Sequence, residues 1–206
     1  MKLKVPLYIN KHYDCGPVCL EMIFDFFGQK KSFEEIQQVV NPEKSGATLT
    51  IGLAKAAQHF GFQTTFYTKQ LVNEELFTHE FYQEVTNGEE EYFKKIKVLT
   101  AECESLGVNI YEKTLTLKDI TKKISEDCLA IIILDWGVIK GLDKYHGHFV
   151  VITGYDEDNI YVNQPGPSNP DTNMKISREL FDRARKAPGT DEDIMFIQRK
   201  NKELML

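Results

Sequence analysis

Hydrophobic residues along the chain recur at two different spacings. In residues 15–28 and 89–107, apolar side chains return every three or four positions, which predicts helices that end at glycines. In residues 129–136 and 148–155, branched and aromatic residues form nearly continuous apolar runs, which are typical of buried strands. Helical patterns dominate the first 107 residues, and strand patterns dominate the rest.

Local signals predict the remaining elements. Ser32 and Glu35 form a capping-box pattern at the start of one helix. The predicted helices cover residues 32–40, 48–61, 116–127 and 177–186. Further strands are predicted over residues 63–68, 108–114, 159–164 and 193–198. The polar run 155–159 is a turn that makes a hairpin of its two flanking strands, and the proline-rich residues 163–173 are expected to form a loop.

The segregation of helices from strands predicts an α+β fold, because alternating βαβ units would interleave the two. We expect one domain over residues 1–206, a length that can bury a sizeable core. Its helical N-terminal lobe, about 1–107, is expected to pack on a C-terminal antiparallel sheet, about 108–198.

Composition and charge narrow the functional classes. With 42% hydrophobic and 27% charged residues, the chain has the composition of a soluble globular protein. A net charge of −6 with scattered basic residues argues against a nucleic-acid partner. The longest apolar run, 129–134, is too short to cross a membrane, and residues 1–10 lack a signal-peptide pattern. We therefore expect a cytoplasmic protein with reduced cysteines, no membrane partner, no metal and no cofactor; no CxxC pair is present.

Cys15 is a candidate nucleophile. Gly16 and Pro17 begin a helix directly behind it, and the unpaired N–H groups at a helix start favour a thiolate. Gly16 would allow a substrate to approach the backbone, and the Cys15 N–H group could donate to a developing oxyanion. Cys19 lies within the apolar stripe of the same helix and fits a buried structural role.

A thiol nucleophile also needs a base, and the chain has five histidines. His12 would point away from the helix start, His59 lies beside an aromatic pair, and His79 lies in a charged stretch. His146 and His148 stand at the start of an apolar strand, where a histidine is costly to bury unless it is hydrogen-bonded. A structural role is one interpretation of His148, and a base for the thiol is the other.

A catalytic imidazole is usually oriented by a third group. The predicted hairpin brings Gln164 level with His148 and turns Asn163 to the opposite face. Either amide oxygen could accept the imidazole N–H. The alternative is that both residues only polarise the strand end before Pro165.

Several segments resemble known families. "VPLYIN", "YDCGPVCL", "GHFVVITGYD" and "YVNQP" resemble the papain-like fold of bacteriocin-leader (double-glycine) peptidases. The chain is more closely similar to the guanylyl-cyclase-domain-containing protein family of animals and plants. That likeness adds "GATLTIGLAKAAQHFGFQTTFYTKQL", "EFYQE" and "FDRARKAPGTDEDIMFI", in which "GTDEDI" is a specific signature, and it covers residues 5 to about 198.

The resemblance implies a papain-like cysteine peptidase fold with Cys15 as nucleophile, His148 as base and Gln164 as third member. Papain-like relatives have Asp or Asn at the third position, so Gln164 is a departure. They also carry an oxyanion-binding Gln six residues before the cysteine, where this chain has Ile9. Asn10, one residue later, would take that role together with the Cys15 N–H group.

Other residues could line the cleft: Asp14, Gly16, Asp135, Trp136 and His146. A buried tryptophan at a strand end is an equally good interpretation of Trp136.

The expected function is a cysteine-dependent hydrolase that cuts a peptide, isopeptide or amide bond in a peptide or protein substrate, through an acyl-enzyme. One alternative is a catalytically impaired binding module on the same fold. A second is the guanylate cyclase that the family name suggests. "TDED" offers carboxylates for that chemistry but equally fits a solvated strand start, and the sequence has no phosphate-binding glycine motif.

Overall fold

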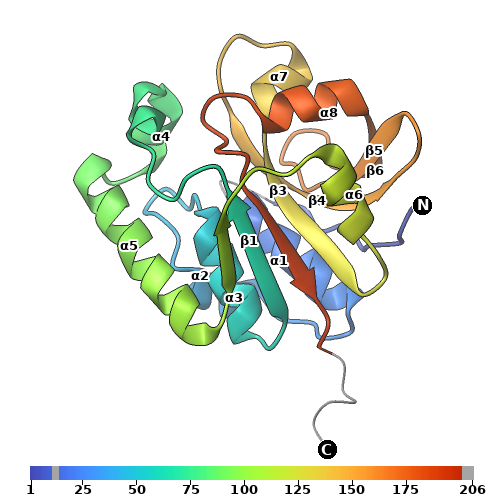
Figure 1. Ribbon diagram of the computed structural model, residues 1–206, viewed down its shortest axis with the longest axis horizontal. Coiled ribbons are helices and arrows are strands. Elements are labelled where there is room, and N and C mark those ends of the chain that lie inside the picture. Colours follow the sequence, from blue (N-terminus) through green and yellow to red (C-terminus); the bar gives the residue numbers. More distant parts are fainter. Residues whose placement is uncertain (11–13, 201–206) are drawn as a thin grey trace, which may run out of the picture.

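A computed structural model describes residues 1–10 and 14–200. Its strands form one seven-stranded sheet in the order β2-β1-β7-β3-β4-β5-β6 (Figure 1). β1 and β2 pair in parallel, and the other neighbours are antiparallel. The strands are β1 (Gln63–Thr68), β2 (Asn109–Glu112), β3 (Cys128–Asp135), β4 (Gly147–Tyr155), β5 (Asn159–Gln164), β6 (Asp171–Ser177) and β7 (Ile194–Gln198).

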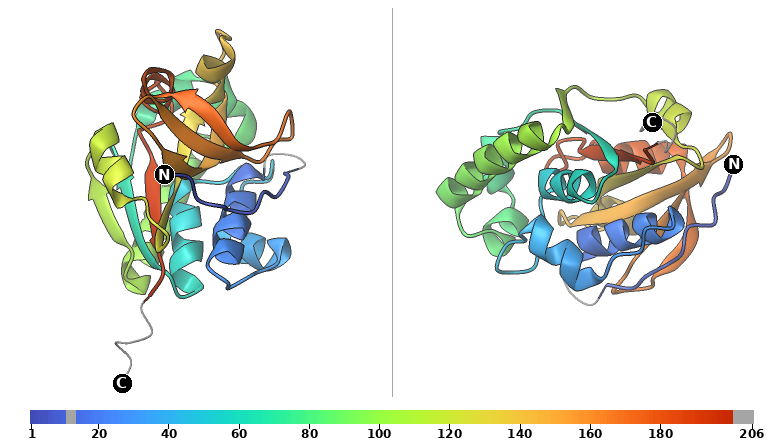
Figure 2. Two further views of the ribbon diagram at one scale, coloured as in Figure 1. Left: turned by 90° about the vertical axis from the view of Figure 1, so that its right-hand side faces the viewer. Right: turned by 90° about the horizontal axis from the view of Figure 1, so that it is seen from below.

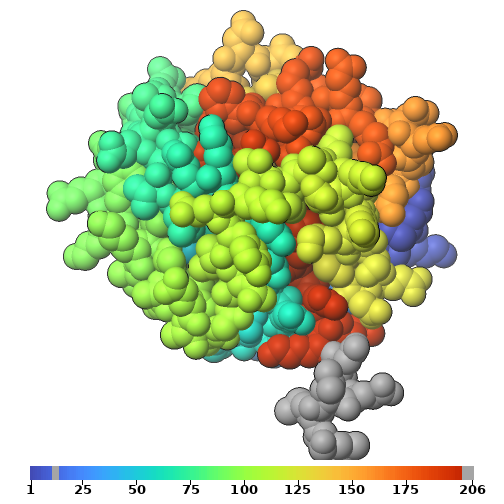
Figure 3. All heavy atoms as spheres, in the orientation of Figure 1, coloured from blue at the N-terminus to red at the C-terminus, as the bar shows by residue number. Residues whose placement is uncertain are grey.

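Helices cover both faces of this sheet. They are α1 (Cys15–Phe26), α2 (Phe33–Val40), α3 (Thr50–His59), η1 (Glu74–Thr78), α4 (Glu80–Val85), α5 (Glu89–Leu106), α6 (Leu117–Lys123), α7 (Trp136–Lys140) and α8 (Arg178–Arg185). α1 packs on β3 and β4 and α3 on β1 and β7, while α8 packs on β3, β5 and β6 from the other side (Figure 2). α6 and its flanking segments cover part of that second face (Figure 3).

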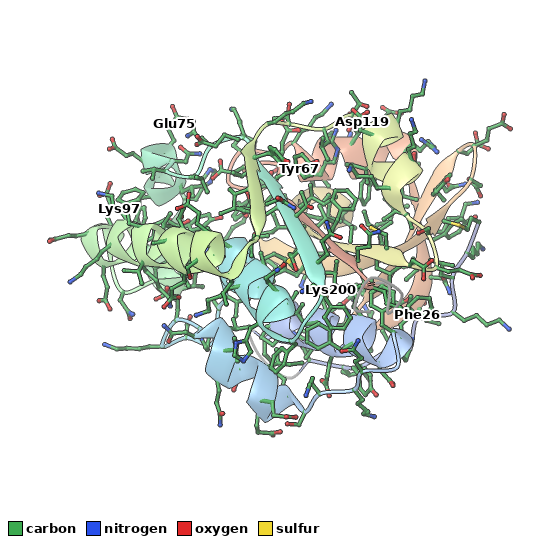
Figure 4. All side chains as sticks on the ribbon, turned by 60° about the horizontal axis from the view of Figure 1, so that its bottom comes forward. Phe26, Tyr67, Glu75, Lys97, Asp119 and Lys200 are labelled. Carbon is green, nitrogen blue, oxygen red and sulfur yellow. The ribbon has the colours of Figure 1, made fainter. Side chains whose placement is uncertain are left out.

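α5 lies beside α3 and β2 at one side of the molecule, with α4 next to it (Figure 1). Lys97 on α5 and Glu75 on η1 project away from the sheet, whereas Tyr67 lies on β1 (Figure 4). Gly107 ends α5 with a positive φ of 83°, a conformation that glycine adopts without a steric penalty. Within residues 1–10 and 14–200, none of the helices combines the length and apolar character that spanning a bilayer requires.

α1 is held by its apolar side. Cys19, Leu20 and Phe24 are fully buried, and the Phe24 ring stacks on Phe62 at a centroid distance of 4.8 Å. Residues 1–3 run along the end of β4, where the Leu3 N–H donates to the Thr153 carbonyl at 2.8 Å. These contacts hold α1 in the core and the first residues of the chain against β4.

The predicted α+β class is confirmed, and so is the hairpin: β4 and β5 pair antiparallel across the expected turn. The capping box of Ser32 and Glu35 is also present. β1 comes from the first half of the chain and lies between β2 and β7, so the sheet is not confined to residues 108–198. The expected loop over 163–173 overlaps strands, because β5 extends to Gln164 and β6 begins at Asp171.

Candidate active site

Cys15 is the first residue of α1 and is 8% exposed. Backbone hydrogen bonds from Phe149 and Gly16 favour its thiolate, but burial outweighs them and raises the pKa of the thiol to about 11, with a smaller contribution from the charge of Asp14. The helix start does lower this pKa, as expected, but the net shift is upward because the larger effect of burial was not anticipated. The thiol is therefore protonated at neutral pH.

The peptide group of Phe149 contacts both cysteines of α1. The Cys19 thiol donates to the Phe149 carbonyl with a sulfur–oxygen distance of 3.5 Å, and the Phe149 backbone bonds to the Cys15 sulfur. Paired residues of β4 and β5 begin at Val151, so the backbone of Phe149 faces α1 instead of β5. This arrangement holds Cys15 next to the residue that follows His148.

His148 is held by Gln164. The Nε2 atom of His148 lies 3.1 Å from Oε1 of Gln164. The Gln164 amide nitrogen donates to the carbonyls of Ser168 at 2.8 Å and Asn169 at 2.9 Å, and the Gly166 N–H donates to Oε1. Because both amide hydrogens are used, Oε1 faces the imidazole and His148 Nε2 must donate. The Nδ1 atom of His148 then carries the lone pair of a base.

The surroundings of His148 keep its imidazole neutral. The side chain is 5% exposed, and the ring of Trp136 lies 4.8 Å from its ring, centroid to centroid. Burial lowers the pKa of His148 to about 4, and the hydrogen bond that Nε2 donates to Gln164 opposes that shift only in part. The neighbouring charge of His146 lowers it further. Trp136 thus shields the imidazole, and it is also buried, as the alternative interpretation held.

The Asp135 side chain makes hydrogen bonds to the backbone at Gly137 and His146. The Asp135 carboxylate caps α7 by accepting from the Gly137 N–H at 2.8 Å, and it accepts from the His146 N–H at 3.1 Å. The His146 ring lines the same cavity as Cys15, and burial lowers its pKa. Asp135 therefore fixes the backbone between α7 and the start of β4. It is not among the described residues that line the cavity.

Two predicted site residues have structural contacts instead. The Asn163 side chain donates to the Val5 carbonyl at 3.0 Å and accepts from the Asn173 N–H at 3.0 Å, so it is turned away from His148. Gly16 faces Thr48 and Leu53, and a Cβ atom there would lie 2.9 Å from Leu53 Cδ1. The space that we expected a substrate to use at Gly16 is filled by the protein itself.

Asn10 lines the same cavity as Cys15. It is 2% exposed, and its N–H donates to the Pro165 carbonyl at 2.9 Å. Asp14 is the N-cap residue of α1 but makes no capping hydrogen bond through its side chain. His12 lies outside the described residues.

One cavity of about 410 Å³ joins these groups. Cys15, His146, His148, Phe149 and Asn10 line one part of it. It continues beneath α4 and α5 to residues that the sequence did not suggest as a site, among them Tyr82, Tyr92, Asp191 and Asp193. The two aspartates belong to the "GTDEDI" segment. That segment is a specific signature of the family that the sequence resembles, and this was the signal from which they could have been suggested as site residues.

Solved structures share this architecture at low sequence identity. A double-glycine-motif protease from an AMS/PCAT transporter, solved with its leader peptide, is 17% identical with a TM-score of 0.52, over 96% of this chain and 94% of that one. The peptidase domain of Streptococcus ComA is 18% identical with a TM-score of 0.52, over 95% and 99%. A putative C39-like peptidase from Bacillus anthracis is 12% identical with a TM-score of 0.52, over 98% and 100%. The fold is that of the papain-like cysteine peptidases.

Sequence comparison assigns the chain to a family. The family described as guanylylate cyclase matches residues 7–197, and the protein belongs to this family. Guanylyl cyclase 1 from Arabidopsis thaliana is 26% identical over 208 residues, which cover 92% of this chain and 73% of that protein.

Proposed function

We propose that the protein is a cysteine-dependent hydrolase of a peptide, isopeptide or amide bond. The observation that carries this proposal is the fixed amide of Gln164, which makes His148 Nε2 a donor and leaves Nδ1 as a base in the cavity that Cys15 lines. A Gln in the third position therefore has the hydrogen-bonding role that Asp or Asn has in papain-like relatives.

The Cys15 thiol and the His148 imidazole are both neutral at the start of the reaction, and His148 acts as a general base. His148 Nδ1 accepts the thiol proton as the Cys15 sulfur bonds to the substrate carbonyl carbon. The same proton then passes to the leaving nitrogen as the carbon–nitrogen bond breaks, which leaves a thioester on Cys15. A water that gives its proton to His148 hydrolyses this thioester and restores the thiol. The Cys15 N–H group and the Asn10 side chain are the proposed oxyanion donors.

A binding module on the same fold is the first alternative. The raised pKa of Cys15 favours it, because a buried thiol is less reactive than the thiolate of a preformed ion pair. In that case the cavity would hold a peptide without cleaving it.

Guanylate cyclase activity is the second alternative, favoured by the family description. Among the described residues, the ionisable side chains that line the cavity in addition to Cys15 and two tyrosines are Glu43, Asp191, Asp193, His146 and His148. Carboxylates repel a triphosphate unless divalent cations lie between them. A cyclase reaction in this cavity would therefore depend on Mg²⁺ or Mn²⁺ held by these carboxylates, whereas the proposed hydrolase reaction would not.

Parallel assays separate the three candidates. A solved relative holds a leader peptide, so mixed peptide pools are a suitable first substrate. Wild type, Cys15→Ser and His148→Ala are incubated with the pools and, separately, with GTP plus Mg²⁺ or Mn²⁺. We expect peptide cleavage that both substitutions abolish. Cyclic GMP formation that survives Cys15→Ser would overturn the proposal in favour of the cyclase, and peptide binding without cleavage would favour the binding module.

A further inference from the structure

The cavity at Cys15 extends along one row of residues across the sheet. Ile133 on β3 pairs with Phe149 on β4, and on its other side the Ile133 N–H donates to the Asp193 carbonyl at 3.2 Å. The Thr68 hydroxyl, at the end of β1, donates to the Gln70 carbonyl at 3.0 Å and lies beside the Asp193 side chain. All four side chains line the cavity. Asp193 and Phe149 are thus separated by two strand spacings, about 10 Å.

Asp193 ends this row, and no positive side chain among the described residues pairs with its carboxyl group. Its Oδ1 atom is buried and has no hydrogen-bond partner among the described residues, while the nearby hydroxyls of Thr50 and Thr68 favour the ionised side chain only in part. Asp191 lies beside it, and Asn73 donates to the Asp191 Oδ1 atom at 2.5 Å. Burial, with the charge of Asp191, raises the pKa of Asp193 to about 8. A cation in the cavity would supply the missing partner.

Among residues 1–10 and 14–200, no lysine or arginine lines the cavity near this acidic end. Glu43 lines the cavity too, but Lys95 pairs with it at 2.9 Å. Lys69 and His79 act on Asp191, yet neither lines the cavity, and Glu75 opposes their effect on its pKa.

Aromatic rings form the walls between the thiol and the carboxylates. Phe81, Tyr82 and Tyr92 line the cavity, and the Tyr82 hydroxyl donates to the Gly189 carbonyl at 2.6 Å. Aliphatic side chains of Leu76 and Ile96 complete this part. Such walls suit the methylene stem of a long side chain, and aromatic faces also attract cations.

The backbone at Asp191 is unusual in a way that supports a site. Asp191 and Glu192 have φ angles of 48° and 52°, in the left-handed region that residues other than glycine adopt at a cost. Arg185 pairs with Glu192 at 2.9 Å, and the Lys69 N–H donates to the Asp191 carbonyl at 2.7 Å. These contacts hold the strained turn that carries the two aspartates.

We propose that this cavity receives the cationic side chain of a lysine or arginine residue in a peptide substrate, with its charged end at Asp193 and Asp191. The inference names the substrate class for the proposed hydrolase and rests on that function for its place in catalysis. A peptide backbone at Cys15 and an extended basic side chain together span the row. Because a bound cation favours ionised Asp193, binding releases a proton and strengthens as the pH rises through about 8.

Calorimetry on Cys15→Ala tests binding without turnover. The probes are Nα-acetyl-lysine methylamide and its uncharged isostere Nα-acetyl-norleucine methylamide. We expect the lysine probe to bind about tenfold more tightly. The preference for the lysine probe should grow between pH 6.5 and 9. It should disappear when Asp193→Asn is added to Cys15→Ala. It should persist when Glu126→Gln, which removes an exposed carboxylate, is added to Cys15→Ala instead. Near-ultraviolet circular dichroism checks that each variant is folded.

Equal affinity for the two probes would overturn the inference, as would a lysine preference that survives Asp193→Asn. If Asp193→Asn does not fold, the pH series on Cys15→Ala decides, because a preference that does not grow above pH 6.5 also overturns it. A lysine preference in Cys15→Ala, when wild type cleaves no peptide, would support the cation site and overturn only the hydrolase.

Discussion

His148 Nε2 lies 3.1 Å from Gln164 Oε1, and the amide of Gln164 cannot turn over without losing its bonds to Ser168 and Asn169. A loop next to the site therefore sets the tautomer of the imidazole. Gln164, in place of Asp or Asn, thus still orients the imidazole.

Shortening Gln164 should release the imidazole. In Gln164→Asn, the side chain loses its reach to His148, so we expect a mixture of His148 tautomers and at least a tenfold slower reaction at Cys15. Nitrogen-15 chemical shifts of the imidazole report the tautomer directly. Asn163→Ala is the matched control, because Asn163 holds Val5 and should affect stability alone. An unchanged tautomer in Gln164→Asn would show that Gln164 does not orient the base.

His148 should titrate far below an ordinary histidine. Burial puts its folded pKa at about 4, below the unfolded value of about 6.5, so the unfolded chain takes up the proton first. Stability from the neutral ring should therefore fall as the pH drops from about 6.5 to 4. Trp136→Ala exposes the ring, and we expect the pKa of His148 to rise toward 6.5 in an NMR titration. A wild-type pKa near 6.5 would contradict the buried geometry.

Asp193 should lower the stability of the free protein as the pH rises from about 4 to 8. Its folded pKa of about 8 exceeds the unfolded value, so the unfolded chain loses the proton first and stability falls between about pH 4 and 8. Asp193→Asn removes this loss, and we expect a gain of about 1–3 kcal/mol at pH 8.5 that shrinks toward pH 4. Urea denaturation at the two pH values measures it. A gain that is the same at both would be inconsistent with a buried, protonated carboxyl.

Gly16→Ala should disturb the start of α1. The added methyl would overlap Thr48 Oγ1 and lie 2.9 Å from Leu53 Cδ1, so we expect a loss of about 1–3 kcal/mol. Thr48→Ala removes the closest atom and should restore part of the stability in the double variant. Urea denaturation of the four proteins gives the coupling. Additive effects would show that Gly16 and Thr48 do not meet.

Sequence patterns predicted the elements that have continuous apolar runs or clear caps. The hairpin placed Gln164 beside His148 because strand spacing and turn length set that relation. β6 was missed because it is an edge strand that is mostly exposed and lacks an apolar run. α4 and α7 are too short to show periodicity.

The electrostatic part of the site could not be predicted from sequence. The pKa of Cys15 depends on how deeply the start of α1 is buried, which is set by packing on β4. The role of Gly16 depends on Thr48 and Leu53, which are far away in the sequence. Asp193 lines the cavity that Cys15 lines because β7 lies next to β3, and the sequence does not reveal that strand order.

The most direct test of the central claim is the rate at which iodoacetamide alkylates Cys15, located by mass spectrometry, between pH 5 and 11. The account predicts a thiolate midpoint well above 8.5 and, below it, a slower reaction assisted by His148. That reaction should drop at least tenfold in His148→Ala and remain unchanged in His146→Ala. Identical rates for wild type and His148→Ala across the range would show that the two residues do not act together and would contradict the account.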